Sequence, residues 1–252
     1  MAAPDRETVL RWTGARLQDA AAPAGTALLA ADSWLVQDGA VRAADEHWAR
    51  FGDACVRAGA DPADVADFRR AVTASVPAAG RWFPRVELTA GGLALRVRPA
   101  PPQAFEARVL VGSGDPRSCP RRKGPDLELL IALRREARGA GADELLLCDE
   151  HGALREGALS SLLWWEEDTL CTTPDEHTLP GITRALLLDS ARRRGVGVRV
   201  RSPLPRELAG LEVWLTSALH GIRVVSAWLS PSQETGAATH APAWREELDR
   251  DG

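Results

Sequence analysis

The chain has 252 residues, of which 45% are hydrophobic and 26% are charged, and its formal net charge is −4 at pH 7. This length is enough for one large domain or two modest domains with a proper core. The slightly acidic balance excludes a global basic field that would attract nucleic acid, and no apolar run approaches the roughly 18 residues of a membrane span.

The N-terminal part predicts a mixture of hairpins and helices. Apolar residues alternate around an Asp-Gly pair in the first hairpin, and the second hairpin turns at Gly91–Gly92. The second helix has Asp61 as its N-cap, followed by Pro62 in the first turn. The hairpins are expected at residues 32–41 and 82–99, and the helices at residues 45–59 and 61–76.

Residues 99–126 form a break that is rich in Pro and Gly, and a domain boundary is expected near residue 115. Strands and helices of mixed order follow it, which favours an α/β (α+β) chain in two lobes, 1–115 and 116–252. The expected elements are a helix at 126–141, three strands within 142–172, a helix and a strand within 179–203, a short helix and two strands within 204–229, and a last helix around 244–248.

The cysteines and histidines suggest neither disulfides nor a metal site. Four cysteines lie far apart without a C-x-x-C pair, which predicts reduced thiols in a cytoplasmic protein. The five histidines show no paired ligand spacing, so no metal is expected.

Lys123, in the stretch SCPRRKGPD, is the only lysine among 31 lysines and arginines. Tyr and Asn are absent as well, and Ile occurs three times, which together indicate a GC-rich coding sequence. A lysine that persists under such a bias favours a function that needs a primary amine. Taken alone, chance survival on a solvated surface is equally compatible with the composition.

Four blocks of the sequence resemble the fold-type IV pyridoxal phosphate enzymes, the class IV aminotransferases. This family includes branched-chain and D-amino-acid aminotransferases and 4-amino-4-deoxychorismate lyase. The resemblance is strongest from Lys123 to Val225, and it implies a two-lobe, D-amino-acid aminotransferase-like fold with the cofactor between the lobes and a homodimeric assembly. The blocks are EHWARF, GADELLLCDEHGALREGALSSLLWW, LPGITRALLL and VWLTSALHGIRVV.

The resemblance implies that Lys123 forms the Schiff base with pyridoxal 5′-phosphate, because only a primary amine condenses with an aldehyde. It implies that Glu156 keeps the pyridine nitrogen protonated. Without the family, Glu156 is also compatible with a solvated carboxylate at the end of a strand.

The resemblance also implies a phosphate site. PGIT provides free N–H groups at a helix N-terminus, LTSAL provides hydroxyls, and an N-terminal arginine provides a guanidinium. Each segment alone is compatible with an ordinary helix start, strand end or solvated arginine. The residues implied are Gly181, Ile182, Thr183, Thr216, Ser217, Ala218 and Arg50, with His47 one helical turn before Arg50 in a supporting or structural role.

The substrate side departs from the family. KGPDLELL lacks the Asn and Tyr that often follow the lysine, and the first strand has Ala31, Asp32 and Ser33 where many members have a Phe-Glu-Thr-like segment. Pocket tyrosines cannot exist in this chain. Ser33 and Arg98 are the remaining candidates for substrate contacts, with Arg98 as a clamp for a carboxylate.

These features predict an aminotransferase that acts on an amino acid and keto acid pair. Two alternatives stay open: a 4-amino-4-deoxychorismate lyase that forms 4-aminobenzoate and pyruvate, and a non-catalytic relative that binds a phosphorylated ligand. The expected partners are a small amino acid or amino-carboxylate substrate and a second copy of the chain.

Overall fold

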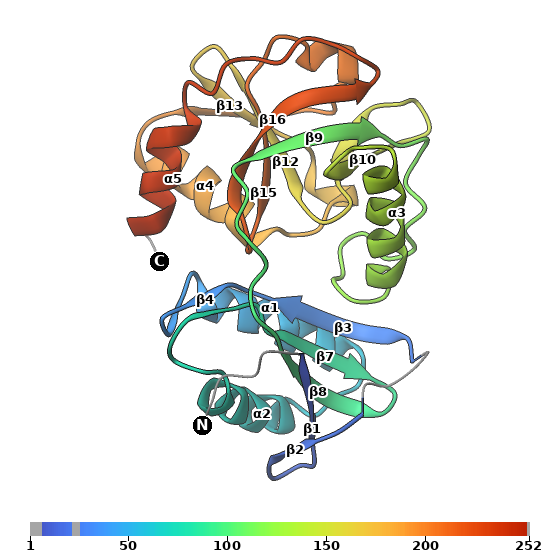
Figure 1. Cartoon of the computed structure of the whole chain (residues 1–252), viewed down its shortest axis with the longest axis vertical. Helices are drawn as coiled ribbons and strands as arrows, with labels where there is room; N and C mark the ends of the chain where they lie inside the picture. Colours follow the sequence, from blue (N-terminus) through green and yellow to red (C-terminus); the bar gives the residue numbers. More distant parts are fainter. Residues whose placement is uncertain (1–6, 22–25, 251–252) are drawn as a thin grey trace. The chain divides into compact units, whose positions relative to one another are not determined.

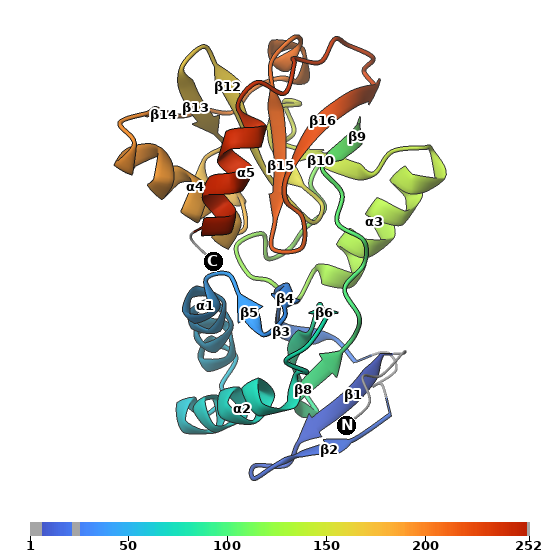
Figure 2. The same cartoon turned by 60° about the vertical axis from the view of Figure 1, so that its left-hand side comes forward.

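The computed structural model describes residues 7–21 and 26–250, and this part divides into two compact units (Figures 1 and 2). Unit 1 contains the chain up to Pro102 and a short returning segment, Arg122–Leu127. Unit 2 contains Gln103–Arg121 and the chain from Glu128 onward. The only lysine therefore belongs to unit 1, although the chain on both sides of its segment belongs to unit 2. The outermost residues of the two predicted lobes, 1–6 and 251–252, lie outside the described part.

Unit 1 is built on a five-stranded antiparallel sheet with the order β2-β1-β8-β7-β3 and a smaller sheet with the order β5-β4-β6. Helix α1 packs against β3, and helix α2 contacts α1 and β8. The elements are β1 (Thr8–Trp12), β2 (Leu17–Asp19), β3 (Leu28–Ser33), β4 (Val36–Gln37), β5 (Ala40–Val41), α1 (Ala44–Arg57), α2 (Pro62–Ser75), β6 (Arg81–Trp82), β7 (Arg85–Thr89) and β8 (Gly92–Val97).

The core of unit 1 is aromatic. Trp48 and Phe51 lie three residues apart on α1, so both point to the same side of the helix, where they meet Phe68 of α2. Helix α2 begins as predicted, because the Asp61 side chain accepts a hydrogen bond from the Ala63 N–H at 2.9 Å. The two helices are thereby fixed on one face of the sheet.

Unit 2 is built on an eight-stranded mixed sheet with the order β11-β10-β9-β16-β15-β12-β13-β14. Strand β9 is parallel to both of its neighbours, β10 and β16. The predicted break contains this strand, so the division between the units falls before β9 and differs from the boundary expected near residue 115. The strands are β9 (Glu106–Val111), β10 (Glu144–Cys148), β11 (Leu154–Gly157), β12 (Ser161–Glu166), β13 (Thr169–Thr172), β14 (Gly197–Val200), β15 (Val213–Ser217) and β16 (Gly221–Ser230).

Helices α4 (Ile182–Arg193) and α5 (Ala241–Arg250) pack on one face of this sheet. Trp165, Trp214 and Trp244 form the centre of that contact. Helix α3 (Leu127–Gly139) packs against β10 instead. Alternation along β12 explains the layers, because Trp165 faces the helices whereas Trp164 belongs to the core on the opposite face. Two short 3-10 helices, Asp175–His177 and Pro205–Leu208, complete the unit.

Most predicted elements are present, with small differences. The first hairpin is confirmed as β4 and β5, and both Asp38 and Gly39 in its turn have positive φ, which suits Asp-Gly. The second hairpin turns one residue earlier than predicted, because Gly92 already pairs with Thr89. Residues 142–172 form four strands and not three, since a further hairpin joins β12 to β13.

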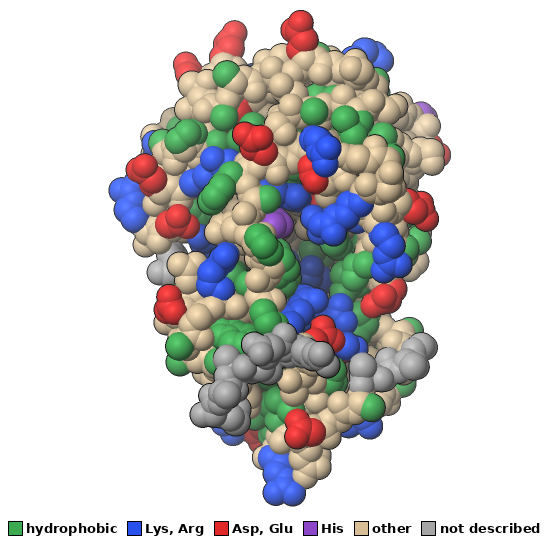
Figure 3. Space-filling view, in the orientation of Figure 1, with side chains coloured by type: hydrophobic (Ala, Val, Ile, Leu, Met, Phe, Trp, Pro, Cys, Tyr) green, Lys and Arg blue, Asp and Glu red, His purple; other side chains and the backbone are tan. Residues whose placement is uncertain are grey.

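The visible face in Figure 3 carries acidic and basic side chains interspersed, as the small net charge suggests. In the described residues, no helix is both long and apolar enough to cross a membrane.

Candidate active site

Lys123 lies in the returning segment of unit 1. Its carbonyl oxygen accepts a hydrogen bond from the Ala31 N–H of strand β3 at 2.8 Å. The next residue, Gly124, has φ 138, and its carbonyl oxygen accepts a hydrogen bond from the Leu127 N–H at 2.9 Å, where α3 begins. Lys123 therefore lies in a tight turn that is hydrogen-bonded to β3, the edge strand of the five-stranded sheet.

Asp32, at the end of β3, is fully buried and organises the predicted residues Ser33, His47 and Arg50. The Ser33 N–H and the Arg50 guanidinium donate hydrogen bonds to its carboxylate at 2.7–2.8 Å. His47 Nδ1 lies 3.0 Å from Oδ1. Burial raises the pKa of Asp32, but the charge of Arg50 and the hydrogen bonds from His47 and Arg50 outweigh it and hold this pKa well below its ordinary value. The cluster fixes α1 to β3.

Arg98, the predicted substrate residue, follows β8 in a group of arginines. Glu87 accepts hydrogen bonds from both Arg85 and Arg96. Arg98 instead donates to the Phe83 carbonyl oxygen at 2.8 Å, with its guanidinium 5.0 Å from the centre of the Phe83 ring. Burial lowers the pKa of Arg98, and repulsion from Arg85 adds to this effect. Arg98 is thus a partly buried cation whose hydrogen bond goes to a neutral oxygen.

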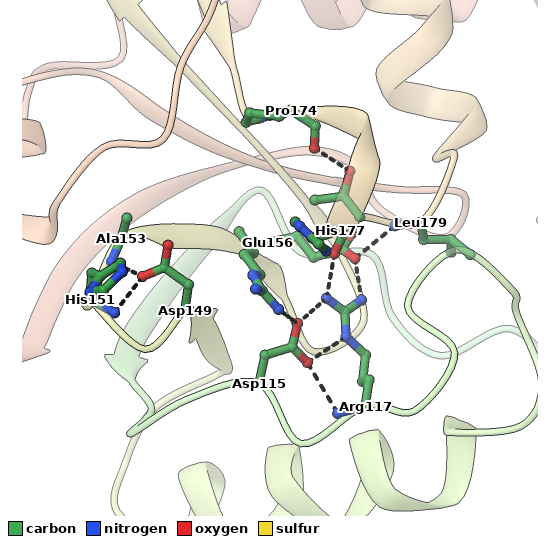
Figure 4. Close-up of polar contacts among 11 residues, drawn as sticks. Asp115, Arg117, Asp149, His151, Ala153, Glu156, Pro174, His177 and Leu179 are labelled. Carbon is green, nitrogen blue, oxygen red and sulfur yellow. Dashed lines mark hydrogen bonds and ion pairs between the residues drawn. The ribbon is translucent and has the colours of Figure 1, made fainter.

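Glu156, in β11 of unit 2, is 3% exposed (Figure 4). Its Oε1 accepts hydrogen bonds from Arg117 Nη1 and from the Leu179 N–H, the latter at 2.8 Å. Its Oε2 has no hydrogen-bond partner among the described residues. Burial raises the pKa of Glu156 to about 7, although the charge of Arg117 and the Leu179 N–H act in the opposite direction.

Arg117, which the sequence interpretation missed, holds this carboxylate in place. Its buried guanidinium donates two hydrogen bonds to Asp115 at 2.7–2.8 Å and a third to the His177 carbonyl oxygen at 2.9 Å. Arg155 donates to Asp115 from the other side at 2.8 Å. Figure 4 shows the resulting chain of alternating charges that ends at Glu156. The sequence signal is slight: an Asp and an Arg two residues apart in a Pro- and Gly-rich segment.

The PGIT segment forms the start of α4. Gly181 is its N-cap, and no side chain caps the free N–H groups of the first turn, which includes Ile182 and Thr183. A Cβ atom at Gly181 would overlap the hydroxyl oxygen of Ser161, so a larger residue here would require that hydroxyl to rotate away. Uncapped N–H groups at the positive end of a helix dipole favour an anion.

The LTSAL segment lies next to this helix start. Thr216 of β15 is directly opposite Ser161 of β12, and its buried Oγ1 has no hydrogen-bond partner among the described residues. Ser217 Oγ accepts a hydrogen bond from the His220 N–H at 3.3 Å, and Ala218 follows in the turn to β16. A buried hydroxyl left unpaired costs about 1–3 kcal/mol, so a bound acceptor at Thr216 would be favourable.

The chain is similar to proteins of one known family. The family model described as amino-transferase class IV matches residues 29–228, whereas a search of curated proteins finds no match. A hypothetical aminotransferase from Mycobacterium tuberculosis in its PLP-bound form is 19% identical, with a TM-score of 0.81 and 97% of this chain and 98% of that chain covered.

Two further solved structures are similar. A protein described as a 4-amino-4-deoxychorismate lyase from Legionella pneumophila is 19% identical, with a TM-score of 0.73 over 88% of this chain and 91% of that chain. The branched-chain amino acid aminotransferase from Escherichia coli is 16% identical, with a TM-score of 0.73 over 97% of this chain and 93% of that chain. The TM-scores show a shared fold, which confirms the predicted fold-type IV architecture, and at these low identities they show the fold alone. The family model extends from β3 to β16, and the chain belongs to the class IV aminotransferase family.

Proposed function

We propose that this chain is a pyridoxal phosphate-dependent aminotransferase that exchanges the amino group of an amino acid with a keto acid. The observation that carries the proposal is the buried, unpartnered Thr216 hydroxyl beside the uncapped, side-chain-free start of α4 at Gly181. Among the described residues no group pairs with these donors, and a phosphate would accept hydrogen bonds from them. Family membership supports chemistry of the aminotransferase class.

The phosphate end of the cofactor fits the residues of unit 2. The Ile182 and Thr183 N–H groups and the Thr216 and Ser217 hydroxyls provide donors for phosphate oxygens. The turn at Ala218 provides a further backbone N–H. Arg50, in unit 1, is a further candidate for the phosphate, and its guanidinium is oriented by Asp32.

The ring end of the cofactor fits Glu156. Its Oε2, which has no hydrogen-bond partner in the described part of the chain, is an acceptor for a protonated ring nitrogen, and Arg117 with the Leu179 N–H orients the carboxylate through Oε1. A positive charge at the ring nitrogen would favour the ionised form of Glu156 and offset the effect of burial on its pKa. Glu156 would therefore keep the ring nitrogen protonated.

Lys123 has two roles in this proposal, covalent attachment of the cofactor and proton transfer. When bound, the cofactor supplies an aldehyde that condenses with amines and a ring that withdraws electrons from the reacting carbon. Lys123 Nζ is the primary amine that would hold this aldehyde covalently, and as a free amine it would accept the proton from the substrate α-carbon. Arginine can do neither, because its guanidinium stays protonated.

Arg98 and Ser33 are the candidates for substrate contacts. Arg98 donates its hydrogen bond to a neutral carbonyl, so its charge is available to the carboxylate that amino acids and keto acids share. Ser33 follows Asp32 in the same strand, and its backbone is fixed by the Asp32 carboxylate. We also infer a homodimer in the cytoplasm, which light scattering and fractionation would test.

Reduction with borohydride tests the attachment at Lys123. The purified protein with added pyridoxal phosphate should absorb visible light and, after reduction, carry the cofactor mass on the peptide that contains Lys123. Lys123→Arg, which keeps the cation, should abolish both signals. A wild-type protein that stays colourless with added cofactor would refute the enzyme and support a non-catalytic relative.

Product assays separate the two enzymatic candidates. The aminotransferase should form keto acids from a panel of D- and L-amino acids, each offered with an acceptor keto acid. The similarity to the Legionella protein makes the lyase the second candidate, and it should form 4-aminobenzoate from aminodeoxychorismate. A protein that makes 4-aminobenzoate and no keto acid from the panel would replace the first proposal with the second.

A further inference from the structure

We propose that Gly124 is a positioning residue for Lys123, because the absence of a side chain lets the backbone that carries the amine lie directly on the edge of strand β3. The inference rests on the proposed function, since it takes Lys123 as the attachment point of the cofactor. The geometry that supports it lies within unit 1.

The contact between Gly124 and Ala30 is a backbone-to-backbone contact. A Cβ atom at Gly124 would lie 2.8 Å from Ala30 Cα, 2.9 Å from its carbonyl carbon and 3.0 Å from its nitrogen. Real Cβ contacts are longer than these distances, and strand backbone cannot rotate away as a flexible side chain can. The φ of 138 at Gly124 also belongs to a region that residues with a Cβ rarely adopt. Any other residue would therefore push the segment off the strand.

One backbone hydrogen bond fixes the position of Lys123 along strand β3. The Ala31 N–H donates to the Lys123 carbonyl oxygen at 2.8 Å. Strand β3 is at the edge of its sheet, so within residues 7–21 and 26–250 this N–H has no strand beyond it to pair with. The returning segment, Arg122–Leu127, occupies the position that a further strand would have. Ala31, which it contacts, is only 2% exposed.

The strand beneath Lys123 is itself rigid. Strand β3 pairs with β7 along its other side, and the next residue, Asp32, is bound by Arg50 and His47 of α1. On the far side of the turn, the Leu127 N–H donates to the Gly124 carbonyl oxygen. The backbone is thus fixed at the Lys123 carbonyl and at the Gly124 carbonyl that follows it, which constrains the direction in which the Lys123 side chain leaves the backbone. A reactive group that is misplaced by about 1 Å can lose on the order of a hundredfold in rate.

Gly124→Ala tests the proposal, with Gly92→Ala as a matched control. Gly92 also has positive φ, at 97°, but a Cβ atom there would meet nothing within 4 Å, so the control carries the conformational strain without the clash. Gly124→Ala should slow covalent attachment of pyridoxal phosphate roughly tenfold or more, whereas Gly92→Ala should change it less than about twofold. Attachment is followed by the appearance of the visible band and by borohydride trapping.

Affinity for pyridoxamine phosphate separates positioning from general damage. This compound has no aldehyde and cannot attach to Lys123, so Gly124→Ala should leave its dissociation constant within about twofold of wild type. Attachment at the wild-type rate in a folded Gly124→Ala protein would overturn the proposal. A parallel loss of affinity for both compounds would also overturn it, because the defect would then lie in the binding site as a whole.

Hydrogen exchange of the wild-type protein gives a second test that needs no variant. The Ala31 amide should exchange at least about a hundredfold more slowly than an unpaired edge-strand amide, since it is bonded to Lys123. Rapid exchange at Ala31 would overturn the proposal even if Gly124→Ala does not fold. If the wild-type protein never attaches pyridoxal phosphate but Ala31 is protected, the proposed function fails while the backbone contact stands.

Discussion

Replacing Glu156 with Gln should change how the stability of the cofactor-free protein depends on pH. Burial raises the pKa of Glu156 from 4.5 to about 7. Between these two values the folded protein keeps a proton that the unfolded chain has already released. The wild-type free energy of unfolding should therefore fall as pH rises from 4.5 to 7, by up to about 3 kcal/mol at about 1.4 kcal/mol per pKa unit. Glu156→Gln has no titrating proton at this position, so its free energy of unfolding should not show this decrease with pH.

Urea unfolding measured by tryptophan fluorescence at several pH values between 4.5 and 8.5 checks this expectation. The informative quantity is the wild-type free energy of unfolding minus that of Glu156→Gln, which should decrease with pH and level off above 7. Glu150→Gln is the matched control for the loss of an exposed carboxylate, because the Glu150 side chain is 87% exposed. A difference for Glu156→Gln that is flat or rises with pH would refute the reasoning.

Three further substitutions test the polar clusters. Arg117→Met should raise the pKa of Glu156 above 7, because the nearest opposing charge is lost, and the pH titration of stability should then extend to higher pH. Thr216→Val should leave apo stability unchanged or improved, while calorimetry should show roughly tenfold weaker binding of pyridoxal phosphate and little change for pyridoxal, which has no phosphate. Asp32→Asn should cost about 3–5 kcal/mol in urea unfolding at neutral pH. Because the pKa of Asp32 is lowered, this wild-type advantage is present above the ordinary value of 3.8 and shrinks as pH falls below it.

Local sequence patterns predicted the elements that carry the candidate cofactor contacts. The start of α4 at Gly181, the strand that contains Thr216 and ends at Ser217, and the α2 cap at Asp61 each depend on residues within a few positions of one another. Glycine, proline and small polar residues act locally, so their consequences are visible in a short window. The spacing of these segments along the chain was then enough to suggest the family, which the match to residues 29–228 confirms.

Contacts between distant segments could not be predicted in this way. Nothing near Arg117 in the sequence indicates that its guanidinium would be buried against Glu156, 39 residues away. Strand β9 was hidden because its pairing with β10 and β16 is parallel and non-local, while Pro and Gly flank it. The pairing of Arg50 with Asp32 is of the same kind, since it requires α1 to pack on β3. Burial of charged groups depends on tertiary packing, which local propensity does not encode.

The distribution of arginine and lysine in this chain follows from what each cation can do. Asp32 is bound by two N–H groups of Arg50, and Asp115 by two of Arg117, so each ion pair uses the planar fork of a guanidinium. A lysine in either place would offer a single point charge and leave a buried carboxylate oxygen poorly satisfied. At residue 123 the requirement is reversed, because a group that stays protonated can neither attach to an aldehyde nor accept a proton from carbon. A coding bias toward arginine is therefore compatible with every structural ion pair described above, and it would be harmful only where a nucleophilic amine is required.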